Sequence, residues 1–204
     1  MTLKEVAYDW LGWNEHLFFF INAGLPDALR ALPLLGSALG NYWAAPLPFG
    51  ALLWWSRRAP DEHRRSRAER QAYVFAVSFL LAFAVAALVK WSLDLPRPAS
   101  VLGTSVRLLA PEEPGHSFPS GHTVYAALVA ASVWPLAGGM GRLALVLCTL
   151  WVAYSRVALG AHFPADVAGS LLLALLCACA TGRLWDRLSK SVRERRGRFR
   201  FSKE

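Results

Sequence analysis

The sequence predicts an all-α fold, a polytopic membrane helical bundle of about five to six transmembrane helices with amphipathic helices at its N-terminus. Of the 204 residues, 55% are hydrophobic and only 18% are charged, whereas soluble domains carry about 25% charged residues. Several apolar stretches approach the roughly 20 residues that a helix needs to cross a hydrocarbon core of about 30 Å. The length favours one domain, so we expect residues 1–204 to form a single membrane domain.

Residues 1–35 are expected to lie on the membrane surface rather than to cross it. The apolar run at 17–25 is interrupted by an asparagine and a glycine and is too short to span a bilayer. We therefore predict two interfacial helices, at roughly 3–21 and 26–35. No basic segment precedes a long apolar core and a small-residue cleavage site, so we expect no cleaved signal peptide.

Five apolar segments between residues 38 and 183 are expected to form the transmembrane bundle. They lie at about 38–56, 71–90, 119–137, 141–159 and 164–183. A long Pro-rich segment, 91–118, joins the second segment to the third, and tight Gly-containing turns join the last three. The sequence thus predicts five helical spans joined by connections of unequal length, with most of the irregular chain in one of them.

Basic residues are concentrated on one predicted side of the membrane. The connection 57–70 holds six Arg, the tail from Arg183 to Glu204 holds nine Lys or Arg, and Arg142 adds one. Because cytoplasmic loops carry an excess of Lys and Arg, we place these segments, including the tail at 184–204, in the cytoplasm. The net charge of +8 is then mostly a signal of topology, and we expect no nucleic-acid partner.

Three polar clusters stand at the opposite, outer ends of the predicted spans. In chain order they are Lys90-x6-Arg97-Pro98, Pro119-Ser120-Gly121-His122 and Ser155-Arg156-x5-His162-x3-Asp166. The positive-inside bias disfavours basic residues on this side unless function requires them. Ionisable residues at inward-facing span ends are candidates for function. We therefore expect the clusters to converge in one extracytoplasmic pocket.

The basic residues of these clusters suit a multiply charged anion. Arg97 and Arg156 offer planar, bidentate donors, and Lys90 offers a point charge. Phosphoryl transfer depends mainly on positioning and on neutralising charge on the phosphate oxygens. The clusters therefore indicate a phosphate ester or anhydride as the ligand.

The second cluster is expected to open the third span with an anion-binding helix end. Pro119 suits the first turn of a helix, and helix N-termini leave backbone N–H groups unsatisfied. The N–H groups of Ser120, Gly121 and His122 should therefore point outward and bind phosphate. Gly121 lets the oxygens approach closely, and the Ser120 hydroxyl can donate a further hydrogen bond.

The third cluster suggests a histidine nucleophile. His162 lies just before Pro164, which we expect to begin the last span, so Asp166 falls in the first helical turn. Its carboxylate can orient the imidazole and stabilise positive charge on it, which leaves the other ring nitrogen to attack phosphorus. His122 can protonate the departing oxygen and then activate water. The sequence thus indicates a phosphohistidine intermediate.

Together, the three clusters resemble the pattern of the type 2 phosphatidic acid phosphatase (PAP2) superfamily, with no substitution over about residues 70–175. The resemblance implies a metal-independent mechanism without a cofactor. It implies catalytic roles for His162, His122 and Asp166. It also implies phosphate binding by a larger set of residues: Lys90, Arg97, Ser120, Gly121 and Arg156.

The five apolar spans and the compact size are similar to those of bacterial undecaprenyl diphosphate phosphatases and phosphatidylglycerophosphate phosphatases. This implies an enzyme of the bacterial inner membrane, with its site on the periplasmic face and a membrane lipid phosphate as its partner. Undecaprenyl diphosphate is our first expectation for the substrate. Phosphatidylglycerophosphate, phosphatidic acid and lipid A phosphate are alternatives, as is phosphate transfer to a second lipid. The oligomeric state is left open.

Two further alternatives concern the kind of site. His116, His122, His162 and Asp166 could bind zinc, although three nearby cations disfavour a divalent ion; we expect no metal and place His116 in a loop at the pocket mouth. The chain could also be a non-enzymatic lipid-binding membrane protein. The complete His-Asp pair favours catalysis over binding alone.

Overall fold

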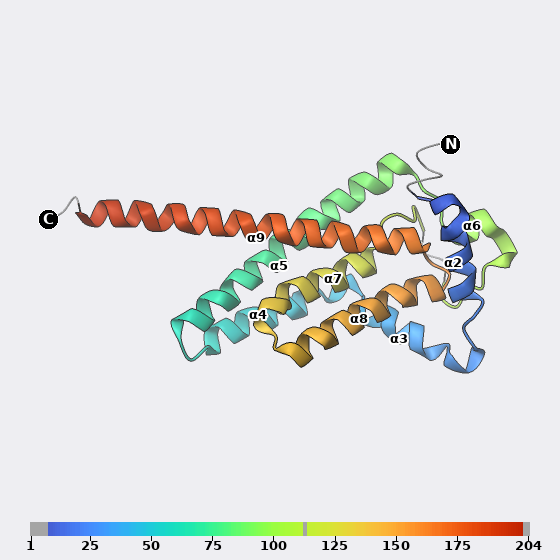
Figure 1. The fold of residues 1–204 in the computed structure, drawn as a ribbon, viewed down its shortest axis with the longest axis horizontal. Coiled ribbons are helices and arrows are strands. Elements are labelled where there is room, and N and C mark those ends of the chain that lie inside the picture. Colours follow the sequence, from blue (N-terminus) through green and yellow to red (C-terminus); the bar gives the residue numbers. More distant parts are fainter. Residues whose placement is uncertain (1–7, 112–113, 202–204) are drawn as a thin grey trace.

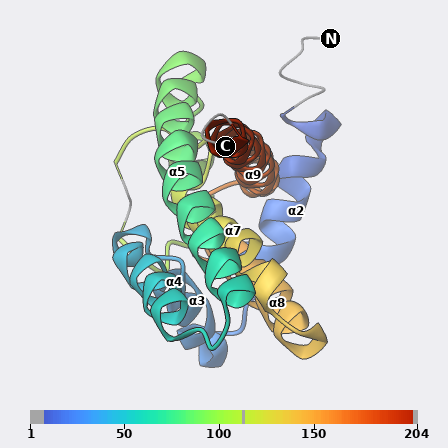
Figure 2. The ribbon, with the colours of Figure 1, turned by 90° about the vertical axis from the view of Figure 1, so that its left-hand side faces the viewer.

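Helices dominate the computed structural model, which describes residues 8–111 and 114–201, with only the backbone described at 192–201. No strand occurs within these ranges. The long helices lie side by side along one axis, and α9 extends past the others (Figures 1 and 2). The predicted all-α helical bundle is confirmed.

Short helices occupy the region where two interfacial helices are predicted, at 3–21 and 26–35. In chain order they are η1 (Trp10–Gly12), α2 (Trp13–Asn22), η2 (Asp27–Leu29) and α3 (Ala31–Leu39). Residues 1–7 of the first predicted helix lie outside the described residues. The two halves, Trp10–Asn22 and Asp27–Leu39, are bent by 86° and together have the length and composition of a broken span. Their placement on the membrane surface stays a prediction.

Three segments of the described chain are long and apolar enough to cross a membrane singly. They are Glu62–Ser105, Gly139–Ala158 and Pro164–Ser191, and the bent N-terminal pair could make a fourth. The first holds α5 (Glu62–Leu93), α6 (Pro98–Leu102) and η4 (Gly103–Ser105), and the others correspond to α8 (Gly139–Ala158) and α9 (Pro164–Phe201). The predicted spans 71–90, 141–159 and 164–183 therefore lie within continuous helices, except that α8 ends one residue before 159.

The span predicted at 38–56 is not one continuous helix. After α3 come the 3-10 turn η3 (Tyr42–Ala44) and then α4 (Pro46–Arg58). The break begins at Asn41, which is extended and whose side chain accepts a hydrogen bond from the backbone N–H of Trp43 (3.1 Å). Figure 1 shows α3 and α4 following one another along the bundle. The predicted span is thus interrupted in its first part.

The span predicted at 119–137 is also shorter than expected. Its helix, α7 (Gly121–Val133), has 13 residues, fewer than the roughly 20 that cross a bilayer. It ends in the 3-10 turn η5 (Trp134–Leu136), where Pro135 has no N–H to continue an α-helix. α7 instead packs against α5, α8 and α9, in the middle of the bundle (Figure 2).

The core lies where α7 meets its neighbours. Phe75 of α5, Leu128 of α7 and Ala174 of α9 are each at most 2% exposed and belong to one apolar cluster. Leu52 of α4 belongs to the same cluster and α4 packs on α5, while α3 packs on α8. The ends of α5, α7 and α9 that carry the polar clusters are therefore held by a shared core, and α8 packs against α7.

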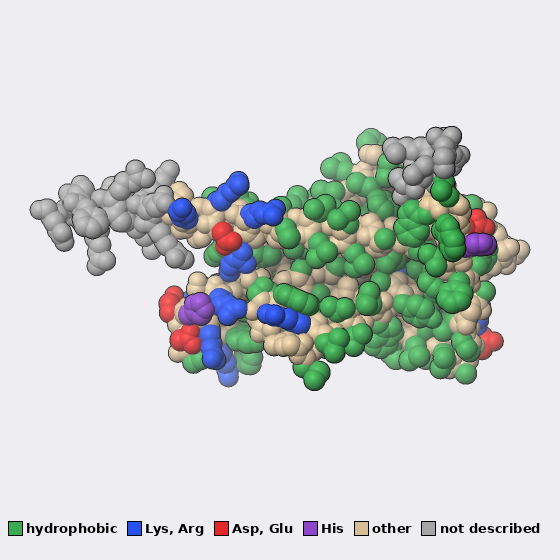
Figure 3. Space-filling model, in the orientation of Figure 1, with side chains coloured by type: hydrophobic (Ala, Val, Ile, Leu, Met, Phe, Trp, Pro, Cys, Tyr) green, Lys and Arg blue, Asp and Glu red, His purple; other side chains and the backbone are tan. Residues whose placement is uncertain are grey.

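Charged side chains gather at one end of the bundle, where α4 meets α5, and along the outer part of α9 (Figure 3). The long sides of the bundle are apolar. The basic connection predicted at 57–70 is largely the first turns of α5, whose N-cap Asp61 accepts from the N–H of Arg64 (2.8 Å). The tail predicted at 184–204 continues α9 as a helix to Phe201. Exposed apolar sides and one basic end are typical of a membrane protein.

Candidate active site

The three polar clusters meet at the end of the bundle opposite the basic end. A cavity of about 580 Å³ lies there, between the C-terminal part of α5, the start of α7 and the turn before α9. It is lined, among others, by Lys90, Arg97, Gly121, His122 and His162. The two histidines therefore face one space, although 40 positions separate them in the sequence.

His162 and Asp166 form a buried pair in the wall of this cavity. Nδ1 of His162 lies 3.4 Å from Oδ2 of Asp166, and their side chains are 2% and 0% exposed. Asp166 falls in the first turn of α9, which begins at Pro164. Its Oδ2 also accepts a hydrogen bond from the N–H of Phe163 (2.8 Å). Because Nδ1 faces the carboxylate, Nε2 is the nitrogen left for a substrate.

Burial sets the protonation state of His162. Burial and, to a smaller extent, the charges of Arg156 and Arg97 lower the pKa of the imidazole to about 4, against the opposing effect of Asp166. The usual histidine pKa is about 6.5. At neutral pH the ring is therefore uncharged, as a nitrogen nucleophile must be.

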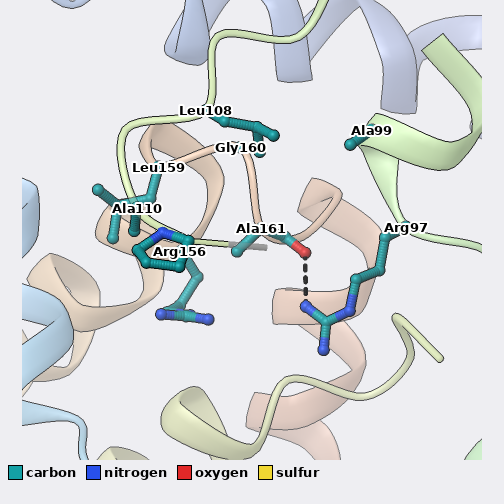
Figure 4. Close-up of a pocket in the computed structure, with 9 residues that line it drawn as sticks. Arg97, Ala99, Leu108, Ala110, Arg156, Leu159, Gly160 and Ala161 are labelled. Atoms are coloured by element: carbon teal, nitrogen blue, oxygen red, sulfur yellow. Dashed lines mark hydrogen bonds between the residues drawn. The ribbon is translucent and has the colours of Figure 1, made fainter. Parts of the chain in front are cut away.

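Two buried arginines flank the turn that carries His162. The Nε of Arg97 donates to the carbonyl of Gly115 (3.1 Å), and its Nη1 donates to the carbonyl of Ala161 (3.0 Å). Nη1 of Arg156 donates to Oγ of Ser37 (2.6 Å). Figure 4 shows both arginines lining a small cavity beside Ala161. Arg97 also lines the larger cavity. Positive charge is thus held close to the proposed nucleophile.

Lys90 lies in the last turn of α5 and lines the cavity. Its Nζ donates to the carbonyl of His116 (2.7 Å). That bond ties the connection before α7 to α5 and places the ammonium group at the cavity wall. Lys90 and Arg97 are thus in one cavity, as the sequence predicts.

The N-terminus of α7 differs from the prediction at Ser120. Its N–H donates to Oγ of Ser170 on α9 (2.7 Å), and its hydroxyl accepts from Thr123 (3.2 Å). The residue is fully buried. The expectation of an outward-pointing Ser120 N–H is therefore wrong, because α9 approaches α7 closely enough to use it. Gly121 and His122, by contrast, line the cavity.

Four residues near the site were not anticipated. Ser117 donates to Oδ2 of Asp166 and lies 3.5 Å from Nδ1 of His162. Tyr8 donates to Oδ1 of Asp166 (2.8 Å). Asn41 and Tyr42, from the break between α3 and α4, line the cavity, and the Tyr42 ring meets that of His122 edge-on at 5.6 Å. Of these four residues, only Ser117 lies close in sequence to one of the three clusters, just before Phe118 and Pro119. No motif indicated the other three.

The structure gives the zinc alternative no support. Among the side chains described at residues 8–111 and 114–191, no three His, Cys, Asp or Glu are placed to hold a metal ion. His116 pairs instead with Asp94, with 2.7 Å between Nδ1 and Oδ1. It lies at the cavity, as expected, but on the α5 side.

Known proteins share this sequence pattern and fold. The sequence profile of the PAP2 superfamily matches residues 71–190. The undecaprenyl-diphosphatase of Sulfolobus acidocaldarius is 26% identical over 80% of this chain and 74% of its own length. The lipid A 1-phosphatase of Rhizobium johnstonii is 34% identical over 53% of this chain and 48% of its own.

A solved structure shows the same fold. The transmembrane PAP2 type phosphatidylglycerolphosphate phosphatase of Bacillus subtilis superposes with a TM-score of 0.69, at 21% identity, over 88% of each chain. The profile match covers more than half of this chain and contains all three polar clusters. The chain therefore belongs to the PAP2 superfamily, as a membrane phosphatase that acts on lipid phosphates.

Proposed function

We propose that the chain hydrolyses undecaprenyl diphosphate to undecaprenyl phosphate at the periplasmic face of a bacterial inner membrane, with His162 as nucleophile and without a metal ion. The main support is the buried His162–Asp166 pair, which adjoins a cavity lined by Lys90, Arg97 and His122. The name of one relative, an undecaprenyl-diphosphatase, supports the choice of lipid.

In the first step, Nε2 of His162 attacks the terminal phosphorus of the lipid. The bond from this phosphorus to the bridging oxygen breaks, and His122 protonates that oxygen as undecaprenyl phosphate leaves. Asp166 stabilises the imidazole as it becomes positive. Arg97 and Arg156 neutralise charge on the phosphoryl oxygens, where preorganised donors lower the barrier most.

In the second step, the phosphohistidine is hydrolysed. His122 is now neutral and takes a proton from a water molecule, whose oxygen attacks the phosphorus. The bond between phosphorus and Nε2 breaks, inorganic phosphate is released, and both histidines return to their starting states. If a lipid hydroxyl replaced the water, the same step would transfer phosphate to that lipid.

The apolar part of the cavity suits a lipid substrate. Phe83, Ala86 and Ala87 of α5 line it, together with Trp43, whose side chain is largely exposed. A phosphate group can therefore occupy the polar part while the chain remains in the bilayer. The competing substrates also present a phosphate group to the polar part of the cavity. They are phosphatidylglycerophosphate, phosphatidic acid and lipid A phosphate.

A substrate panel tests the proposal. The purified full chain, in detergent with a chelator, is given undecaprenyl diphosphate and the three competing lipids, and phosphate and lipid products are measured by mass spectrometry. We expect the fastest release of phosphate from undecaprenyl diphosphate. A phosphorylated second lipid would identify a transferase, and no product from any lipid would leave a lipid-binding protein as the better explanation.

A paired substitution tests the nucleophile. His162→Ala should remove the product and the acid-labile phosphoenzyme, whereas His63→Ala, an exposed residue at the basic end of α5, should leave both unchanged. Full activity in His162→Ala would exclude the proposed mechanism.

The proposed orientation has its own test. A fluorescent protein fused to the C-terminus should fluoresce in the cytoplasm, because the basic end of the bundle is placed there. A fusion that is dark, while a periplasmic reporter at the same position is active, would reverse the orientation.

A further inference from the structure

The N-terminal segment at residues 8–22 packs against the turn that carries His162 and forms hydrogen bonds with residues on both sides of it. This segment lies outside residues 71–190, which the PAP2 profile matches. It nevertheless contacts both sides of the connection between α8 and α9. The contacts are hydrogen bonds or ring contacts made by four residues: Asn14, Asn22, Phe18 and Tyr8.

The asparagines fix the ends of the two helices. Nδ2 of Asn22 donates to the carbonyl of Ala158 (3.0 Å), the last residue of α8. Oδ1 of Asn14 accepts from the N–H of Ala165 (2.9 Å), in the first turn of α9. Asn14 and Asn22 are 2% and 0% exposed. Buried amide groups are kept only where they are hydrogen-bonded, so these contacts locate α2 against the turn.

Aromatic rings pack the same segment onto the turn. Phe18 of α2 is fully buried, and its ring centroid lies 5.3 Å from that of Phe163. The Tyr8 ring meets Phe163 edge-on at 6.4 Å and Phe118 edge-on at 6.2 Å. These rings direct the Tyr8 hydroxyl toward the carboxylate behind His162.

Tyr8 completes the hydrogen bonds of Asp166. Its hydroxyl donates to Oδ1 (2.8 Å), while Oδ2 accepts from Ser117 and from the N–H of Phe163 and faces His162. Burial, followed by the charge of Asp166, raises the pKa of Tyr8. The phenol therefore keeps the proton that it donates. With both oxygens bonded, the carboxylate cannot rotate without breaking a buried hydrogen bond.

We propose that Tyr8 is a positioning residue for phosphoryl transfer, through which the N-terminal segment holds Asp166 in the rotation that points Oδ2 at His162. This inference rests on the proposed function, since it takes His162 as the nucleophile. Tyr8 is not among the residues that line the cavity. Its effect should therefore appear in the chemical step and not in lipid binding.

The test removes only the hydroxyl. In Tyr8→Phe the ring contacts remain, and a hydrogen bond to a charged group is lost, so kcat should fall about tenfold while KM for the lipid stays within about twofold. The melting temperature in detergent should change by only a few degrees. The matched control is Tyr73→Phe, whose ring packs on Trp185 in the region of the basic end (4.7 Å) and which should keep full activity.

A double-mutant cycle separates positioning from a general structural effect. Because Tyr8 acts through the Asp166 carboxylate, adding Tyr8→Phe to Asp166→Asn should cost less than about twofold in the rate of phosphoenzyme formation. An undiminished tenfold loss in that background, or unchanged kcat in Tyr8→Phe alone, would overturn the inference. If the wild type forms no phosphoenzyme, or His162→Ala still forms one, it is the proposed function that fails.

Discussion

Oδ2 of Asp166 lies 3.4 Å from Nδ1 of His162, with both side chains shielded from solvent even though His162 borders an open cavity. A buried carboxylate is stable only when it is hydrogen-bonded, and Ser117, Phe163 and Tyr8 provide those bonds. The imidazole is therefore oriented before substrate arrives. Such preorganisation needs no rearrangement at the moment of reaction.

Asp166→Asn should retain the fold and lose most of the activity. The amide keeps the size of the carboxylate but cannot stabilise positive charge on His162. Its NH2 group also donates to Nδ1 of His162, which favours the imidazole tautomer with the proton on Nε2, the nitrogen that should attack. In a serine protease the corresponding change lowers kcat by about 10⁴, and we expect a loss of about 10² to 10⁴ here. Steady-state phosphate release and a thermal melt measure the two quantities. Activity within a few-fold of wild type would show that His162 does not depend on this carboxylate.

The acid limb of phosphoenzyme formation should lie unusually low. Protonated His162 cannot attack, and burial lowers its pKa to about 4, below the usual value of about 6.5. The rate should therefore stay near its plateau as the pH falls from about 7 to about 5.5, and be lost only as it approaches about 4. The measurement is the single-turnover rate of phosphoenzyme formation. Steady-state rates are unsuitable, because hydrolysis of the intermediate requires neutral His122 and would add a second loss of rate at low pH. An inflection near pH 6.5 would contradict a buried, neutral nucleophile.

Arg97→Lys should damage both activity and stability. Arg97 is 6% exposed and donates from two nitrogens to the carbonyls of Gly115 and Ala161. A lysine cannot reproduce this planar geometry, and a buried carbonyl left unbonded costs about 1–3 kcal/mol. We expect phosphate release to fall at least about tenfold, with a lower melting temperature.

Arg142→Lys is the control for that substitution. Its guanidinium is exposed and lies 5.4 Å from the centre of the Trp134 ring, far along α8 from the site. Equal losses in the two variants would show that the planar geometry of Arg97 has no specific role at the site.

The sequence predicted those parts of the structure that depend on local composition. The start of the last span at Pro164 and the span at 141–159 agree with α9 and α8, because long apolar runs and a proline specify them locally. The break after Asn41 was missed, since a short polar interruption in an apolar run does not show which way the chain turns. The motifs located the cavity residues because each cluster sits at a span end.

The remaining features depend on contacts between distant segments. Tyr8 and Asp166 are 158 positions apart, and no local pattern in the N-terminal segment points to that contact. The same holds for Ser120, whose N–H is taken by Ser170 of α9. Which donor remains available at a helix N-terminus is decided by the neighbouring helix, and a motif does not contain that information.

Gly169→Ala tests the close approach of α9 to the segment before α7. A methyl group at Gly169 would overlap the ring of Phe118, which adjoins Ser117, a hydrogen-bond donor to Asp166. Overpacking of this kind costs about 1–3 kcal/mol, so the melting temperature should fall and phosphate release should fall with it. Gly50→Ala is the control, because nothing lies within 4 Å of the added methyl in α4, and a glycine-to-alanine change inside a helix stabilises by about 0.5–1 kcal/mol. If the two variants have the same melting temperature, the Phe118 ring moves aside without cost and does not hold Ser117 against Asp166.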